Sequence, residues 1–260
     1  MNSRAAAAIV AMLFSTSAMG DGNQFANGQA VSLQPDKAYV LVRTIGKSCG
    51  FANIACFRMV PFLIRTLSNE ELGQASALAR EDPDHWRDRV ESNVVEPLPD
   101  QPYAEQGEEE FLLISLKPGT YVLGGMAGAE HGPGVILTSL CMGTVKFEAK
   151  PGAITDLGTI LWALDDRPTT IPELSAYVTG KPVGNGPNGV AAAIRPATST
   201  TEVPETLVSL PRVAADYWAV LPTPNYLGAA LGRLAPLAGV LAYDKDGHVI
   251  DLKSGQSTSH

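Results

Sequence analysis

Short apolar runs separated by turn-forming residues make up much of the chain. Residues 37–45 and 56–66 are rich in Val, Ile, Leu and Phe, which predicts two central strands that are covered on both faces. Residues 144–149 instead alternate polar and apolar side chains. This alternation predicts a strand with Val145 and Phe147 facing a core and the charged side chains between them facing water. The pattern favours a mainly β fold.

Lys-Pro-Gly occurs twice, at residues 117–119 and 150–152, and each copy separates two apolar runs. Pro sets the φ angle of a turn and Gly supplies a left-handed conformation, so both segments are expected to be turns. We predict that the first turn joins residues 111–116 to residues 120–123 in a β-hairpin. The second is expected to lead into a strand at residues 156–161.

Helix signals occur at two places. Ser68 stands three residues before Glu71, the spacing of a capping box, and Asp-Pro at residues 82–83 adds a second start signal. We therefore predict a helical excursion between strands. Residues 227–234 carry apolar side chains at i, i+3, i+4 and i+7, which predicts a small C-terminal helix that ends before Pro236.

The expected elements divide the chain into a principal domain and smaller attachments. Several short strands with closely spaced turns, and no alternation of strands with helices, favour an antiparallel β-sandwich over residues 30–164. Pro, Gly, Asn, Ser and Thr are frequent over residues 165–205, as is typical of a linker. Residues 206–253 are expected to hold the small helix and a β-hairpin with an Asp-Lys-Asp-Gly turn. Residues 254–260 are expected to be a disordered tail.

The sequence around the two turns resembles a known kind of module. Residues 116–123 read Leu-Lys-Pro-Gly-Thr-Tyr-Val-Leu, residues 143–147 Gly-Thr-Val-Lys-Phe, and residues 156–160 Asp-Leu-Gly-Thr-Ile. This arrangement is similar to uncharacterised exported bacterial envelope proteins with a transthyretin-like sandwich, a module also seen as a regulatory-type domain beside carboxypeptidases. The resemblance implies a transthyretin-like or immunoglobulin-like sandwich with a binding, stalk or adaptor role and no shared catalytic motif. It implies no functional residue and does not extend to the C-terminal segment.

Residues 1–20 have the features of a secretory signal peptide. Arg4 supplies a positive charge, residues 5–14 are uncharged and apolar, and small residues follow. We expect cleavage before Asp21, with cleavage after Ala18 as the alternative. A retained membrane anchor is less favoured, because the apolar run is shorter than the ~20 residues of a membrane-spanning helix, and no cysteine for lipid attachment follows the cleavage site. A periplasmic or secreted protein without stable membrane insertion is predicted.

Composition and charge narrow the range of partners. The chain of 260 residues is 45% hydrophobic and 18% charged, as expected for a folded protein. Its formal net charge is −8 and its Lys and Arg residues form no basic cluster, which argues against nucleic acid and anionic membrane surfaces as partners. An envelope protein or a glycan is the expected partner, and no cofactor is predicted.

Three cysteines allow one disulfide in an oxidising compartment. Cys49 and Cys56 are separated by a loop short enough to bring their sulfur atoms together, so this pair is the candidate disulfide. Cys141 lies in an apolar run and is expected to be a buried thiol, although a bridge from Cys141 to either of the others remains an alternative. A nucleophilic cysteine is not favoured, because no histidine stands in a recognisable relation to any of the three.

Several polar segments suggest chemistry, and each also has a simpler structural interpretation. Residues 184–189, Gly-Asn-Gly-Pro-Asn-Gly, match the spacing of a dinucleotide-binding loop, but Pro187 removes an amide donor, so a flexible linker is favoured. Carboxylates and His85 within residues 81–88 suggest a divalent-metal surface, although the interleaved arginines favour a solvated helix face. His131 in a Gly-rich loop is a candidate general base without a nearby nucleophile motif.

Asp244, Asp246 and Asp251 resemble part of a calcium loop, but the ligand spacing and the terminal Glu of an EF-hand are absent, so a turn is favoured. The sequence also lacks the Gly-x-Ser-x-Gly, Ser-x-x-Lys, His-Glu-x-x-His, Cys-x-x-Cys and P-loop motifs. No catalytic, cofactor-binding or metal-binding residue is therefore assigned, and a non-enzymatic role is favoured over an enzymatic one.

Tyr217, Trp218 and Tyr226 form a candidate aromatic surface for a glycan or peptide, with packing onto the sandwich as the simpler interpretation. The leading hypothesis is an exported, non-catalytic binding or structural module of the cell envelope that engages a partner through loops or by strand addition at a free sheet edge. One alternative is a small-ligand or glycan binder, which predicts that these rings line an open groove. The other is a hydrolase-type enzyme with an unrecognised site, which predicts a cleft that gathers His131 or His85 with carboxylates.

Overall fold

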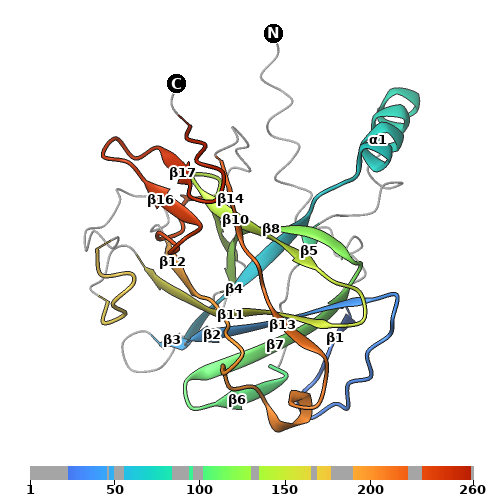
Figure 1. Cartoon of the computed structure of the whole chain (residues 1–260), viewed down its shortest axis with the longest axis vertical. Coiled ribbons are helices and arrows are strands. Elements are labelled where there is room, and N and C mark those ends of the chain that lie inside the picture. Colours follow the sequence, from blue (N-terminus) through green and yellow to red (C-terminus); the bar gives the residue numbers. More distant parts are fainter. Residues whose placement is uncertain are drawn as a thin grey trace.

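The computed structural model describes residues 23–45, 47–49, 56–83, 94–95, 102–129, 135–164, 169–176, 190–221 and 230–258. These residues form a mainly β structure of two large sheets and one small sheet, with a single α-helix among them (Figure 1). The first large sheet contains, in spatial order, β1 (Asn23–Gln24), β7 (Glu109–Leu116), β2 (Ala38–Ile45), β11 (Ile154–Leu164) and β12 (Val190–Arg195), with β6 (Ala104–Gln106) on β7 and β13 (Arg212–Ala214) on β11. The second contains β14 (Trp218–Val220), β10 (Thr144–Ala149), β8 (Gly119–Ala129), β4 (Cys56–Arg65) and β3 (Lys47–Cys49), with β5 (Val94–Val95) on β4 and β9 (Val135–Ser139) between β8 and β15 (Ala230–Leu231). The small sheet pairs β16 (Leu241–Tyr243) with β17 (Val249–Asp251), which confirms the predicted C-terminal hairpin.

Both large sheets contain parallel as well as antiparallel pairs. β2 pairs with β7 in the antiparallel direction, but β11 runs parallel to β2 and to β13, and β15 runs parallel to β9. The expectation of a purely antiparallel arrangement is therefore wrong. β2 and β11 are connected through a long excursion into the second sheet, so they lack the tight turn that imposes the antiparallel direction on a hairpin.

The two Lys-Pro-Gly segments carry the chain from one large sheet to the other. Residues 117–119 lead from β7 in the first sheet to β8 in the second, and residues 150–152 lead from β10 in the second sheet back to β11 in the first. The predicted hairpin at the first turn is wrong, because β7 pairs with β2 along one edge and with β1 and β6 along the other. The two turns are neighbours, since Ala149 pairs with Gly119 where they meet.

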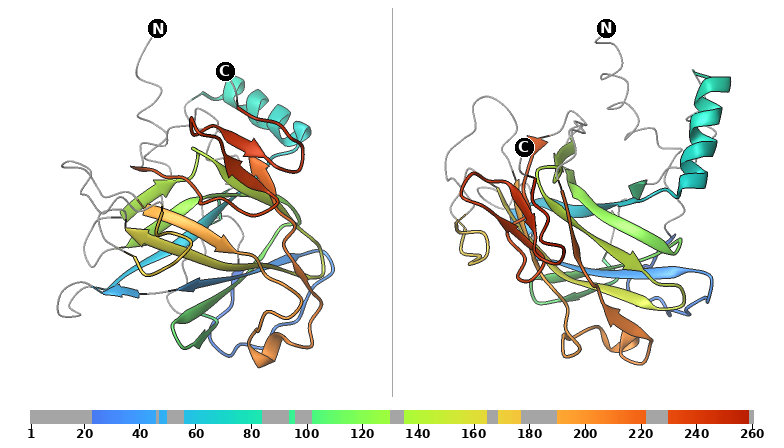
Figure 2. Two further views of the ribbon diagram at one scale, coloured as in Figure 1. Left: turned by 60° about the vertical axis from the view of Figure 1, so that its left-hand side comes forward. Right: turned by 45° about the horizontal axis from the view of Figure 1, so that its top comes forward.

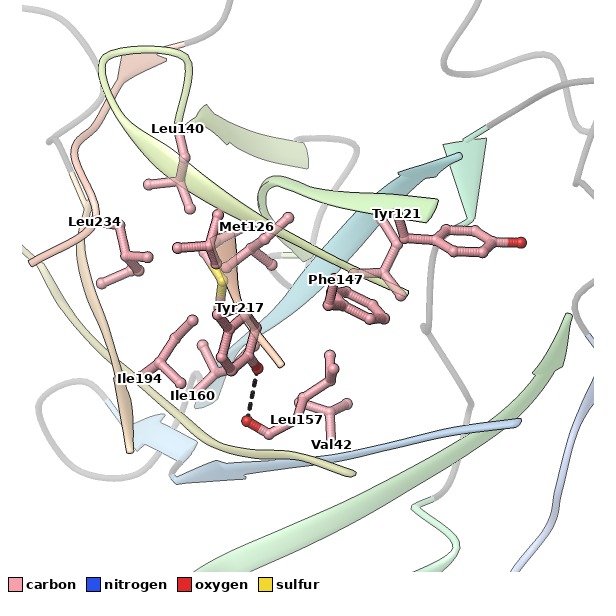
Figure 3. Packing of buried hydrophobic residues seen from close by; sticks show 14 of the residues in the cluster. Val42, Tyr121, Met126, Leu140, Phe147, Leu157, Ile160, Ile194, Tyr217 and Leu234 are labelled. Atoms are coloured by element: carbon pink, nitrogen blue, oxygen red, sulfur yellow. Dashed lines mark hydrogen bonds between the residues drawn. The ribbon is translucent and has the colours of Figure 1, made fainter. Parts of the chain in front are cut away.

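Buried side chains from both large sheets form one hydrophobic cluster. Val42 and Ile160 come from the first sheet, Met126 and Phe147 come from the second, and Figure 3 shows these side chains converging. Each large apolar side chain buried in this way stabilises the fold by roughly 1.5–3 kcal/mol. The predicted alternation of β10 is confirmed, since Phe147 is buried and its two charged neighbours are exposed.

The opposite face of the first sheet is also covered. One apolar cluster on this face includes Leu41 and Phe111, and another includes Leu161 and Ala193. Side chains from the segments before β2 and after β12 pack against the first of these clusters. All residues of β2 and β11 except the last of each are therefore buried. This burial on both faces confirms the central strand predicted at residues 37–45.

The chain after residue 164 completes both large sheets. β12 lies inside the segment expected to be an irregular linker, yet it pairs with β11 and five of its six residues are buried. Ala230 and Leu231, expected in a small helix, instead pair with β9, and Leu234 bridges to Ala192 of β12. The helix prediction is therefore wrong over residues 230–234, because sheet pairing satisfies this backbone, and residues 222–229 lie outside the described part of the chain.

α1 (Asn69–Glu81) confirms the predicted helical excursion and its capping box. The Glu71 N–H donates to Ser68 Oγ, and the Ser68 N–H donates to a Glu71 carboxylate oxygen at 2.8 Å. Arg65 at the end of β4 donates to the same carboxylate, and this hydrogen bond is the main reason that the pKa of Glu71 is lowered to about 2. Figure 2 shows α1 standing away from the sheets, and none of its residues is buried.

Candidate functional site

Three charged side chains meet on the outer face of the first sheet, between its two smaller apolar clusters. Arg43 of β2 forms a bidentate ion pair with Asp156 of β11, with Nη1 2.9 Å from Oδ1 and Nη2 2.9 Å from Oδ2. Arg212 of β13 adds a third bond, from its Nη1 to Asp156 Oδ2 at 2.6 Å. Arg43 and Asp156 are only 1% and 0% exposed, whereas the Arg212 side chain is 19% exposed. We call these three residues the buried ion cluster.

Sheet register explains why these residues meet. In the parallel pair of β11 and β13, Ile154 pairs with Arg212, so Arg212 is two positions behind Asp156 and on the same face. In the parallel pair of β11 and β2, Thr159 pairs with Arg43 beyond an irregularity between Asp156 and Thr159. The Asp156 carboxylate therefore lies diagonally between the two guanidinium groups.

Gly158 forms the irregularity in β11 that positions the Asp156 carboxylate. Its φ is +83°, and a β-carbon at this position would lie 2.0 Å from the carbonyl oxygen of Arg195 on the neighbouring strand. Its N–H donates to Asp156 Oδ1 at 2.9 Å. A glycine is thus required both for the backbone conformation and for the close approach of β12. This bulge corresponds in the sequence to Leu157-Gly158, which follows the second Lys-Pro-Gly turn.

Hydrogen bonds saturate the buried carboxylate. Asp156 Oδ1 accepts from Arg43 and from the Gly158 N–H, and Oδ2 accepts from Arg43 and Arg212. The Arg43 guanidinium also lies 5.3 Å from the ring centre of Phe111, while its Nε has no hydrogen-bond partner among the described residues. Removing one partner of such a buried pair leaves an uncompensated charge, which costs about 3–5 kcal/mol.

A surface hollow of about 300 Å³ lies beside the exposed side of this cluster. Its lining residues come from the end of β6, from the loop after β12 and from the start of β13: Gln106, Ser199, Thr200, Thr201, Glu202, Val203, Val208 and Arg212. Hydroxyl, amide, carboxylate and guanidinium groups are therefore gathered beside two apolar side chains. The volume of the hollow is at the lower end of the range for small-ligand sites, and its lining is more polar than is usual for them.

The loop that walls the hollow is attached to the ion cluster at two points. Arg43 Nη2 donates to the Glu202 carbonyl oxygen at 3.0 Å, and Arg212 Nη2 donates to the Thr201 carbonyl oxygen at 3.2 Å. Within the loop, the Thr198 N–H donates to Thr201 Oγ1 at 2.7 Å. The buried charges thus hold an exposed polar loop in one conformation.

A second, smaller cluster of charged groups occurs at the turn between β16 and β17. Asp244, Asp246 and His248 each offer an oxygen or nitrogen atom, and these atoms lie within 4.8 Å of one another. The sequence had suggested Asp251 as the third member, but that carboxylate instead accepts hydrogen bonds from the Lys253 N–H and the Ser254 hydroxyl group.

Hydrogen bonds within the turn already use these candidate ligand atoms. Asp244 Oδ1 accepts the N–H groups of Asp246 and His248, and Oδ2 lies 2.8 Å from His248 Nδ1. These bonds, the backbone bond from His248 first among them, lower the pKa of Asp244. Lys245 Nζ donates to the Asp246 carboxylate at 2.7 Å. The arrangement is that of a hydrogen-bonded turn, as the sequence predicts.

Tyr217, the first residue of the candidate aromatic surface, is buried and does not contribute to an exposed surface. Tyr217 is 4% exposed, and its hydroxyl group donates to the Leu157 carbonyl oxygen at 2.7 Å (Figure 3). Burial, with a smaller contribution from the charge of Asp156, raises the pKa of Tyr217 well above its usual value. Trp218 is half-buried, with Lys253 Nζ 4.5 Å from its ring centre. Tyr226 lies outside the described residues.

Other candidate residues fall partly outside the described part of the chain. His85, His131 and the Gly-rich residues 184–189 are outside it. Cys49 and Cys56 are described at backbone level only, and they are direct partners in the antiparallel pair of β3 and β4. Cys141 is a free, half-buried cysteine, more exposed than expected.

The sequence does contain a signal for the buried ion cluster, although it is not a catalytic or binding motif. Arg43 interrupts an otherwise apolar run, and Asp156 lies in the predicted strand that follows the second Lys-Pro-Gly turn. A charge within a strand covered on both faces requires an opposite charge close by. The two buried, oppositely charged residues therefore predict an ion pair between Arg43 and Asp156. They do not predict the contribution of the more exposed Arg212.

In the described part of the chain, no helix has both the length and the apolar character needed to cross a membrane. No protein-family model, curated protein or solved structure matches this chain.

Proposed function

We propose that this protein is an exported, non-catalytic binding module of the cell envelope, built on a transthyretin-like sandwich, and that the hollow beside Arg212 is its ligand site. The observation that carries the proposal is the attachment of an exposed polar loop to buried charges. A loop held in one conformation loses little entropy when a ligand binds, so it favours binding. A core cluster that contains side chains from both large sheets supports the sandwich architecture.

The lining of the hollow favours a neutral, polyhydroxylated ligand, and thus a glycan. The Arg212 charge is compensated by Asp156, which it shares with Arg43, and Glu202 adds a second carboxylate at the rim. Formal charges in this region therefore balance, so an anionic ligand gains no net attraction. Hydroxyl and amide groups can exchange hydrogen bonds with a sugar, while Val203 can contact the apolar face of its ring.

The sheet edges are less suitable binding sites than the hollow. Strand addition needs a long unpaired edge. Apart from β12, the outermost described strands have only two or three residues each: β1, β3, β5, β6, β13, β14 and β15. β12 is longer, but Leu234 bridges to Ala192 on its outer edge, and the Ala235 N–H donates to the Ala192 carbonyl oxygen. A surface site of side chains is therefore favoured over strand addition.

Ligand binding can be tested with two valine variants of the chain from Asp21 onward. Val208 lines the hollow and is 68% exposed, so Val208→Trp fills the hollow without disturbing the core. Val213→Trp is the matched control, because Val213 is also exposed but does not line the hollow. Envelope glycan fragments are screened by NMR titration, and affinities are then measured by calorimetry.

We expect Val208→Trp to weaken binding by about tenfold or more, with an unchanged melting temperature, and Val213→Trp to bind as the parent protein does. Equal affinities in the two variants would place the ligand elsewhere. Failure of every fragment to bind the parent protein would contradict the glycan proposal.

Export can be tested independently of binding. We expect the full-length chain, expressed in a bacterial host, to be recovered from the periplasm or medium with an intact mass that begins at Asp21. Leu13→Arg interrupts the apolar run and should leave the uncleaved precursor in the cell. Asn2→Gln is the control and should be processed normally. Processing of both variants alike would contradict a signal peptide.

A further inference from the structure

The short hairpin at one end of the second sheet brings two cysteines into register. β3 and β4 pair in the antiparallel direction, with Lys47 opposite Arg58, Ser48 opposite Phe57 and Cys49 opposite Cys56. Opposite residues in an antiparallel pair have their β-carbons on the same face of the sheet. Their α-carbons are about 4.5 or 5.5 Å apart, depending on whether the two residues exchange hydrogen bonds.

Both of these separations fall in the range that a disulfide requires, which is about 4.4–6.8 Å between α-carbons. We propose that Cys49 and Cys56 form a cross-strand disulfide that closes the β3–β4 hairpin, and that Cys141 remains a thiol. Loop length alone favours this pair but leaves two other pairings open. The strand register supplies the geometric reason for one of them.

The strand ladder also places Cys141 far from both partners. β8 pairs with β4 so that Ala129 is opposite Arg58, near the start of β4. Cys141 follows β9 near the middle of β8, where the Leu140 N–H donates to the Gly124 carbonyl oxygen. Gly124 lies opposite the Phe62–Leu63 irregularity of β4, several residues beyond Cys56. At about 3.3 Å per residue along a strand, Cys141 is on the order of 20 Å from the Cys49–Cys56 pair, too far for a disulfide.

Bridge formation is a two-electron oxidation that needs a disulfide oxidant. One cysteine thiolate attacks a sulfur of the oxidant, forming a mixed disulfide and releasing one oxidant thiolate. The second cysteine thiolate then attacks the mixed disulfide and releases the other oxidant thiolate. Each protein thiol gives up one proton, the two cysteines are oxidised, and the oxidant is reduced to two thiols. In the cell this oxidant belongs to the compartment reached by the proposed export, whereas oxidised glutathione supplies it in the test.

The consequence for the fold is local. β3 has three residues, and β4 is its only partner among the described strands. A pair this short is marginal without further support. The disulfide restricts the open conformations of this end of the sheet, so it should protect the hairpin from local opening.

The test uses the fully reduced chain, equilibrated with oxidised and reduced glutathione, quenched with a thiol-alkylating reagent and digested with trypsin. Cleavage after Lys47 and Arg58 yields one peptide, residues 48–58, that contains both Cys49 and Cys56. We expect this peptide to be lighter by two hydrogen atoms and unlabelled, while Cys141 is labelled in nearly every molecule. Because oxidation takes place in the tube, the result does not depend on whether the protein is exported.

Three cysteine variants test whether the disulfide joins Cys49 to Cys56 and not to Cys141. Cys141→Ser should form the same bridge to the same extent. Cys49→Ser should leave Cys56 labelled, and Cys56→Ser should leave Cys49 labelled, with no cross-link to Cys141 in either case. A doubly labelled peptide 48–58 at a glutathione ratio typical of oxidising compartments would overturn the proposal. So would a cross-linked pair of peptides that contains Cys141.

Discussion

Two clusters of charged side chains in this protein are assembled in opposite ways. The buried ion cluster joins Arg43, Asp156 and Arg212 from three strands that are far apart in the sequence. The turn cluster takes Asp244, Asp246 and His248 from one turn and leaves all three partly or fully exposed. The first cluster exists only when the first sheet is complete, whereas the second needs only one hairpin.

Burial therefore separates charges that the fold requires from charges that contribute little to its stability. Water screens exposed charges, so pairs at the surface contribute little to stability. Buried charges have lost their hydration, and each therefore depends on its partners. We expect substitutions in the buried ion cluster to destabilise the whole domain and to loosen the loop at the hollow. Comparable changes in the turn cluster should stay local.

Replacement of the shared carboxylate should produce the largest effect. Asp156→Asn keeps the size of the side chain but leaves two guanidinium groups without their counter-charge, so we expect a loss of about 3–5 kcal/mol in the free energy of unfolding. Urea denaturation followed by tryptophan fluorescence measures this loss. Asp244→Asn is the matched control and should shift the denaturation midpoint far less. Similar shifts for the two variants would show that the buried cluster is not the more important one.

A substitution at the bulge glycine should have the next largest effect. At Gly158, Ala combines a positive φ with a β-carbon that would lie 2.0 Å from a backbone oxygen, so Gly158→Ala should cost about 2–4 kcal/mol. Gly239→Ala is a control with a φ of +73° and nothing within 4 Å of the added carbon, and it should cost about 1–2 kcal/mol. The difference between the two midpoints isolates the close approach of β12. Equal losses would show that backbone strain alone explains the requirement for glycine.

Local patterns predicted local structure well. The Ser68–Glu71 spacing predicted the start of α1, and the polar–apolar alternation of β10 predicted which side chains are buried. Both depend on neighbours within a few residues. The turn chemistry at residues 117–119 was equally clear, but it sets backbone angles and does not determine which sheet the next strand joins.

The missed features all depend on contacts between distant segments. Half of the residues of β12 are Ala, a weak strand former, so its pairing with β11 decides that it is a strand. Ala230 and Leu231 fit a helical spacing that their pairing with β9 overrides. The buried ion cluster needs the register of β2, β11 and β13 together, and no motif encodes this. The candidate site was therefore less predictable than the fold class.

Arg212 links the stability of the buried cluster to the loop at the hollow, so its replacement should have a smaller but more informative effect. Arg212→Gln removes the third bond to Asp156 and the bond to the Thr201 carbonyl oxygen, so we expect a loss of about 1–2 kcal/mol. Hydrogen exchange should become faster at residues 199–203. Arg195→Gln, which breaks an exposed pair with Glu173, is the control and should leave exchange in this loop unchanged. Slow exchange in both variants would show that Arg43 alone holds the loop.

The smallest expected effect is the pH dependence of the turn cluster. Because the folded-state pKa of Asp244 is lowered below 3.8, its ionised form stabilises the turn above that pH, and this contribution is lost as the pH falls through the folded-state pKa. NMR titration of the Asp244 carboxyl carbon should therefore give a midpoint below 3.8. In His248→Ala the imidazole bond disappears but the backbone bond remains, so the midpoint should move only part of the way back. An unchanged midpoint would assign the shift to the backbone bonds alone, which would make the turn cluster a property of local chain geometry rather than of its charged side chains.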